Sequence, residues 1–266
     1  MRQRAKSLLA LVPLGAIATA SFAFVVASDR SPSRLQLDQA WAAPSAAHPL
    51  GFGEAGVDLF ALVAHATARA LLLAAIVATI GFLVGAPLGT VAGLLRGRAE
   101  RITARACDLV QAFPSFLLAL AVLAAVRTPS RLHIGAVFCL TAWAPFARLA
   151  LVQARVLADA QFVDAARALG ASRARIVLRH VLPNLFGPVA VQLGASAAGV
   201  VLGETALGFV GLGPRDGVSL GALLEQGVVS MLRAPHVLAV GAAAIVLVSL
   251  SLQLASEGLR AGLGQR

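Results

Sequence analysis

Lysine is almost absent from this 266-residue chain, in which Lys6 is the only lysine and arginine supplies the other basic residues. No glycine precedes Lys6, so the phosphate-binding pattern Gly-x-x-x-x-Gly-Lys-Ser/Thr cannot occur. The paired histidines of metalloproteases are missing as well. We therefore expect a chain that is not an enzyme, does not hydrolyse nucleotides itself and binds no metal.

Cysteine is scarce too. Cys107 and Cys139 each lie in apolar surroundings, without the short spacing of a metal or redox motif. We interpret both as packing residues.

Charge is the third shortage. Only 13% of the residues are charged and 59% are hydrophobic, with a mean hydropathy of +0.85. A soluble domain carries about a quarter charged residues. The net charge of +10 lies in the gaps between apolar blocks, not on one soluble face, which excludes nucleic-acid binding. The composition indicates a membrane protein.

The apolar residues fall in blocks long enough to cross a bilayer, which takes roughly 20 residues. A spanning segment must satisfy its own backbone hydrogen bonds, so each block is expected to be a helix. The predicted fold is an all-α polytopic membrane protein of about six transmembrane helices. The predicted spans are Leu8–Ala27, Ala66–Leu95, Cys107–Val126, His133–Val152, Phe186–Phe209 and Val237–Ala255.

Arginine placement orients these spans. Most arginines, such as Arg96, Arg98 and Arg101, fall in segments on the same side as the N-terminus, so both termini are expected in the cytoplasm. The first span could instead be a cleaved signal peptide, which would leave the other spans unchanged. The expected organisation is an N-terminal helix (1–27), a periplasmic segment (28–64) and a core permease domain (65–262), with a cytoplasmic loop at 156–185.

Glycine recurs every fourth residue in the second span, which gives one nearly flat helix face. Such a face lets another helix approach closely. We therefore predict a helix-packing stripe, which Pro87 bends locally. Its members are Gly81, Gly85, Gly89, Gly93 and Gly97.

The polar segment 162–184 predicts a helix-turn-helix outside the membrane. Helix-favouring residues precede Gly170, which suits a turn, and Ser172 can cap a second short helix before Pro183 interrupts the pattern. One side carries small residues (Ala165, Ala166, Ala168), which suits insertion into a partner, and the other side is basic. A basic loop attracted to anionic lipid heads is an equally good interpretation of the chemistry alone.

This segment resembles the Glu-Ala-Ala (EAA) motif of ABC importer permeases. Asp164–Ala166 stands where the motif has Glu-Ala-Ala, Gly170 follows, and His180–Asn184 resembles its His-x-Leu-Pro-Asn ending. The resemblance implies a coupling loop that docks on an ATPase subunit. The matching residues are Asp164, Ala165, Ala166, Gly170, Ala171, Ser172, Arg173, Arg175, His180, Pro183 and Asn184.

Other segments are similar to the peptide/nickel branch of these permeases, the dipeptide- and oligopeptide-like group. They follow in the family's order: His48–Gly51, Ala112–Ser115, Glu204–Gly213 and Glu257–Arg260. Together the similar segments cover roughly residues 48 to 262.

The resemblance implies a type I ABC importer permease in the bacterial inner membrane, forming half of a translocation pathway. Its expected partners are a homologous permease subunit, two ABC ATPase subunits and a periplasmic or lipid-anchored solute-binding protein. This chain would bind no cofactor, since ATP and Mg²⁺ would lie in the ATPase subunits. Peptides are the expected substrates, with nickel, opines, glutathione or other small solutes left open.

Polar side chains inside spans are costly and are functional candidates by default. Asp108 could pair with Arg105, Arg148 could reach the interface by snorkelling, and Glu204 could serve an external gate or join helices by hydrogen bonds. The candidate pathway or gate residues are Glu204, Gln192, Phe209 and Arg148.

Two other function classes remain open. An ion-coupled secondary transporter would usually show internal repeats and buried acidic ion sites, and we find no convincing repeat. A non-transporting membrane scaffold would explain the glycine stripe but not the ordered motifs. An ATPase that copurifies would separate the importer from both.

Overall fold

The computed structural model describes residues 2–126, 128–214 and 217–263, except for the side chains of residues 2–8, 173, 186, 262 and 263. Within these residues the chain is helical, and an isolated bridge between Phe52 and Asp58 is the only strand-like pairing. The predicted all-α fold is confirmed. The α-helices are α1 (Arg2–Ala27), α2 (Leu59–Leu95), α3 (Gly97–Ala112), α4 (Ser115–Ala124), α5 (Arg131–Leu157), α6 (Gln161–Ala168), α7 (Arg173–Ile176), α8 (Phe186–Phe209), α9 (Leu220–Val229) and α10 (Pro235–Leu263).

Five helices in the described residues are long and apolar enough to cross a membrane, namely α1, α2, α5, α8 and α10. A sixth span exists if α3 and α4 are counted together, although these two helices are bent by 64° relative to each other. The sequence predicted one continuous helix over Cys107–Val126, and that prediction was wrong at Pro114. Proline has no backbone N–H and forces the residue before it out of the helical region. Phe113 accordingly has φ −99° and ψ 125°.

Helix α2 begins at Leu59, before the expected Ala66, because Asp58 caps it. The Asp58 side chain accepts hydrogen bonds from the backbone N–H groups of Phe60 (2.9 Å) and Ala61 (3.2 Å). The same carboxylate contacts His48 Nδ1 at 2.8 Å and Arg30 Nη1 at 3.4 Å. One buried side chain therefore starts the helix and ties the segment before it to the bundle.

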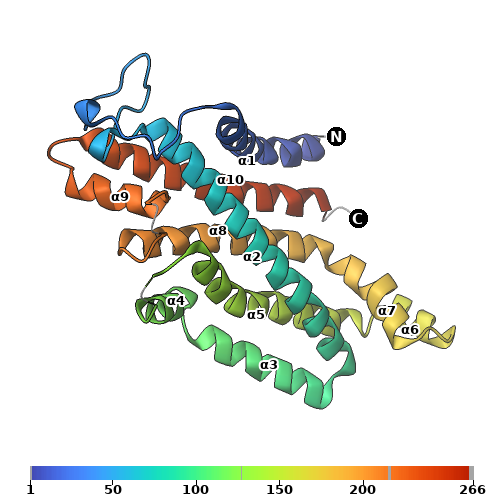
Figure 1. The fold of residues 1–266 in the computed structure, drawn as a ribbon. Helices are drawn as coiled ribbons and strands as arrows, with labels where there is room; N and C mark the ends of the chain where they lie inside the picture. Colours follow the sequence, from blue (N-terminus) through green and yellow to red (C-terminus); the bar gives the residue numbers. More distant parts are fainter. Residues whose placement is uncertain (1, 127, 215–216, 264–266) are drawn as a thin grey trace.

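The long helices form a slab that α2 crosses diagonally, with α1, α10, α8, α5 and α3 in succession (Figure 1). Its core is made of fully buried aliphatic side chains from several helices, such as Val77, Leu123, Ile134 and Val201. In lipid, such side chains favour helix association through the van der Waals contacts that they make when packed together.

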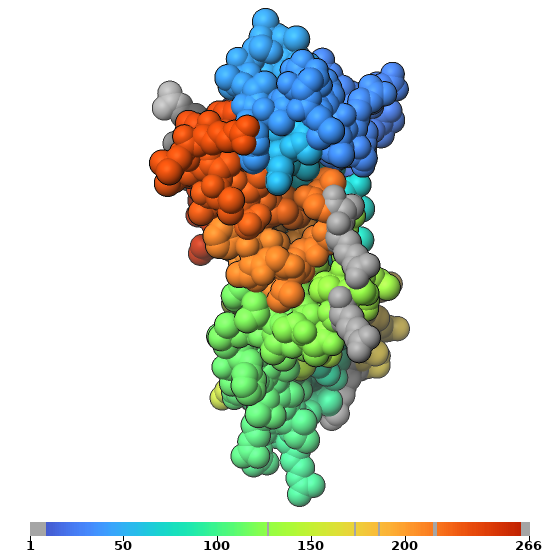
Figure 2. Space-filling model, turned by 60° about the vertical axis from the view of Figure 1, so that its left-hand side comes forward, coloured from blue at the N-terminus to red at the C-terminus, as the bar shows by residue number. Residues whose placement is uncertain are grey.

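The two ends of the slab differ. One end, called here the α9 end, carries α9 and the segment 28–58, which lie side by side in Figure 2. Gln226 of α9 donates a hydrogen bond to Glu54 (3.3 Å), and the Arg233 guanidinium lies 5.7 Å from the centre of the Trp41 ring. The opposite end, called the α6 end, carries α6 and α7, and the N-terminal part of α1 and the C-terminal part of α10 point toward it (Figure 1).

Candidate functional site

The α6 end carries the predicted helix-turn-helix. Helix α6 ends in a Schellman turn, in which Gly170 has φ +78° and donates to the Arg167 carbonyl (2.9 Å), while Ala171 N donates to the Ala166 carbonyl (3.0 Å). Ser172 then caps α7 by accepting a hydrogen bond from Arg175 N at 3.3 Å. The turn and the cap therefore have the geometry that the sequence pattern suggested.

The end of this segment differs from expectation. Pro183 was expected to break the helical pattern, but the chain continues through a π-helical turn (Val177–Val181) and a 3₁₀ turn (Leu182–Leu185) into α8. The proline lies where the hydrogen-bond pattern changes from one turn to the other, so its missing N–H interrupts no regular α-helix. The Asn184 side-chain amide supplies a donor of its own to the His180 carbonyl at 2.5 Å.

The three predicted small residues do not share one face, which corrects the sequence interpretation. Ala166 is buried with Val163 against Ala154 of α5, whereas Ala165 and Ala168 are exposed. The outward surface also carries Leu169, which is 89% exposed.

Among the polar residues of the predicted coupling loop, Asp164 pairs with Arg167 at 3.1 Å. Arg175 is exposed and His180 is half-buried. The side chain of Arg173 lies outside the described residues.

The glycine stripe of α2 lies against α5. A Cβ added at Gly81, Gly85, Gly89 or Gly93 would come closer than 3.0 Å to a carbonyl oxygen of α5. The backbones of these helices therefore touch along their length, as small residues permit in membrane helices. Gly97 was wrongly included in this stripe, because it has φ +62° and nothing within 4 Å of an added Cβ.

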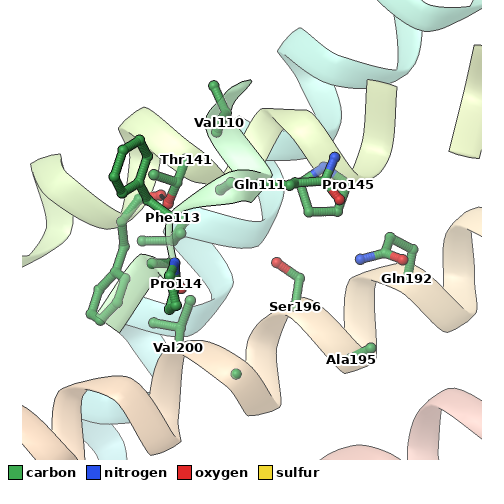
Figure 3. A pocket seen from close by; sticks show the side chains of 15 residues that line it. Val110, Gln111, Phe113, Pro114, Thr141, Pro145, Gln192, Ala195, Ser196 and Val200 are labelled. Atoms are coloured by element: carbon green, nitrogen blue, oxygen red, sulfur yellow. Dashed lines mark hydrogen bonds between the residues drawn. The ribbon is translucent and has the colours of Figure 1, made fainter. Parts of the chain in front are cut away.

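A cavity of about 400 Å³ lies halfway along the slab, at the break between α3 and α4. Irregular backbone at membrane depth is tolerated where it is buried in protein or lines a cavity. Figure 3 shows Gln192 and Ser196 rising from α8 toward Gln111 and Pro145 on the opposite wall. No charged side chain lines this cavity in the described part of the chain. Its polar lining consists of neutral amides and hydroxyls.

Of the four predicted pathway residues, Gln192 lines the cavity and the other three do not. Glu204 is buried nearer the α9 end of α8, where Arg131 acts on it electrostatically. Phe209 borders a separate depression beside α9. Arg148 forms an ion pair with Asp108 of α3, so the expected pairing of Asp108 with Arg105 is replaced by a link between two helices.

Sequence reasoning missed Gln111, Thr141 and Ser196, which also line the cavity. A search for neutral polar residues within apolar spans would have found them, but it could not have shown that they face one space. Among the described residues, no group of three or more His, Cys, Asp or Glu side chains could hold a metal ion.

Comparison with known proteins gives a consistent picture. The family model for the "Binding-protein-dependent transport system inner membrane component" matches residues 85–266. The chain is 34% identical to a glutathione transport system permease protein of Pectobacterium atrosepticum over 218 residues, which is 82% of this chain and 72% of the relative. It is 33% identical to a probable D,D-dipeptide transport system permease protein of Escherichia coli over 230 residues, 86% of this chain and 77% of the relative. A glutathione transport system permease protein of Escherichia coli O1:K1 is 33% identical over 262 residues, 97% of this chain and 86% of the relative.

Proposed function

The chain belongs to the family of binding-protein-dependent transport system inner membrane components, and from this we propose that it forms half of the translocation pathway of an ATP-driven importer. A homologous permease subunit would supply the other half, and two ABC ATPase subunits would supply the energy. A periplasmic or lipid-anchored binding protein would deliver the solute to the α9 end. The alternatives, an ion-coupled transporter and a scaffold, gain no support from relatives named as transport system permeases.

Peptides or similar small solutes are the proposed cargo. The supporting observation is that the relatives described above are named for glutathione and D,D-dipeptide transport. The cavity at the α3–α4 break agrees with this cargo, because its amide and hydroxyl groups can exchange hydrogen bonds with the peptide groups of a solute. The space is within the range of ligand pockets.

The observation that carries the coupling role is the exposed surface of the segment between α5 and α8. Its inner side is fixed to the bundle by Val163, Ala166 and Val181, whereas Leu169 projects from the α6 end. If a bound partner moved this surface, the packed side chains would move α5 and α8 with it. Closure of the ATPases would then shift the population of the bundle between two arrangements.

The test is copurification from the native membrane, with one variant and a matched control. Gly170→Pro removes the donor to Arg167 and forces φ away from +78°, so the Schellman turn of α6 cannot form. Gly211→Pro breaks the same kind of turn after α8, where Gly211 has φ +80° and Leu212 N donates to the Leu207 carbonyl. We expect ATPase subunits and a second permease to copurify with the unsubstituted chain, and the ATPases to be lost in Gly170→Pro only.

ATP-dependent uptake should disappear with the ATPases in Gly170→Pro, while the variant still inserts in the membrane. Preserved uptake by this variant would rule out the coupling assignment. An unsubstituted chain that reproducibly purifies alone would favour the secondary-transporter or scaffold alternative.

A further inference from the structure

The ion pair of Asp108 and Arg148 lies about one helical turn from residues that line the cavity, although neither side chain lines it. Helices α3 and α5 run antiparallel, because Glu100 pairs with Arg155 and Asp108 with Arg148. Gln111 of α3 and Pro145 of α5 continue the same register and both line the cavity. Asp108 precedes Gln111 by three residues and Arg148 follows Pro145 by three, which is nearly one helical turn. Both helices therefore place the pair on the α6 side of the cavity.

Both charged side chains of this pair are exposed. The Asp108 side chain is 63% exposed and the Arg148 side chain 43% exposed in the isolated chain. Charged groups within membrane spans are costly in lipid, so they face water, a partner protein or each other. The cavity itself has a neutral lining, so these two charges stand between that lining and the α6 end.

We propose that Asp108 and Arg148 form a charge-pair gate at the α6 end of the cavity, and that they select solutes by charge as these leave toward the coupling loop. This inference rests on the proposed function. When paired, the two side chains bridge α3 and α5 and neutralise each other. When they separate, Asp108 presents an anionic group and Arg148 a cationic group. A solute that carries an ammonium and a carboxylate group can form an ion pair with each of them at the same time.

The chain offers a matched control on the same two helices. Glu100 and Arg155 also bridge α3 and α5, with a separation of 3.0 Å, but they lie further toward the α6 end and away from the cavity lining. Loss of either pair weakens the contact between α3 and α5. Only loss of Asp108–Arg148 would open the cavity.

The experiment measures thiol labelling of a cysteine placed in the cavity. Ser196→Cys supplies the reporter in a Cys107→Ala/Cys139→Ser background, and the assembled complex is exposed from the α6 side to a cationic and to an anionic methanethiosulfonate. Asp108→Asn and Arg148→Gln should each accelerate labelling about tenfold or more. Asp108→Asn should favour the anionic reagent, because Arg148 is left, and Arg148→Gln should favour the cationic one.

The exchanged variant Asp108→Arg/Arg148→Asp should return labelling to the slow rate, and Glu100→Gln should leave it unchanged. The gate would be overturned if Asp108→Asn and Arg148→Gln were both labelled at a rate within about twofold of the rate of the Ser196→Cys parent. Equal acceleration by Glu100→Gln would show a merely structural contact. Labelling needs neither ATP nor a known substrate, so a failure of the gate is distinguishable from a failure of the importer assignment, which copurification tests.

Discussion

Single side chains decide where several helices of this protein begin and end. Asp58 is the most connected of them, since it caps α2 and also contacts His48 and Arg30 from the segment before the helix. Asp58 therefore links the start of α2 to the packing of the preceding segment against the helix. Pro114 ends a helix instead of starting one. It separates α3 from α4, which would otherwise form one continuous helix.

Substitution of Asp58 separates its two roles. Asp58→Asn keeps an acceptor for the N–H groups of Phe60 and Ala61 but removes the charge that His48 and Arg30 contact. Asp58→Ala removes both, and the loss of the cap alone costs about 1 kcal/mol. We expect the thermal midpoint in detergent to fall in the order unsubstituted, Asn, Ala, with residues 28–58 becoming sensitive to protease. Equal midpoints for Ala and the unsubstituted chain would contradict this.

At the scale of the elements, the contact between α2 and α5 depends on the absence of side chains. Gly85 and Gly89 place the α2 backbone directly on Trp143 and Ala147 of α5. Without a hydrophobic driving force in lipid, this close van der Waals packing is what joins the helices. The four-residue spacing in the sequence identified the face, but only the structure identified α5 as its partner.

Gly89→Ala should therefore destabilise the protein, because its Cβ would meet the Ala147 carbonyl and force the two helices apart. Overpacking of this kind costs about 1–3 kcal/mol. Gly15→Ala is the matched control, since nothing lies within 4 Å of an added Cβ there and alanine favours a helix by up to about 1 kcal/mol. Unfolding midpoints in detergent should move down for Gly89→Ala and not for Gly15→Ala. A Gly89→Ala protein as stable as the parent would show that α2 and α5 separate freely.

At the scale of the whole molecule, the slab has two chemically different ends. The α6 end carries the exposed helix-turn-helix, and the α9 end carries segment 28–58 folded against α9 and α10. The long helices hold these ends apart, so a partner at one end can affect the other only through the bundle. The arginine pattern of the sequence predicts that the α6 end lies in the cytoplasm.

Two exposed leucines test this orientation. Leu169 at the α6 end is 89% exposed and Leu232 after α9 is 98% exposed. In a Cys107→Ala/Cys139→Ser background, Leu232→Cys should react with a membrane-impermeant maleimide in right-side-out vesicles, and Leu169→Cys only in inside-out vesicles. The opposite pattern would reverse the proposed topology, and labelling of both cysteines from one side would contradict a spanning bundle.

The sequence alone determined that the long apolar segments are helical and that a turn and a helix cap follow α6. Apolar length and composition predicted the helical membrane fold, and Gly170 and Ser172 predicted the turn and cap, because these features depend on neighbours within a few residues. The tertiary structure decided what those elements face. It placed Ala166 inward, paired Asp108 with Arg148, and gathered Gln111, Gln192 and Ser196 around one cavity. Such contacts join residues far apart in the chain, and helical periodicity predicts a face of a helix but not the partner that covers it.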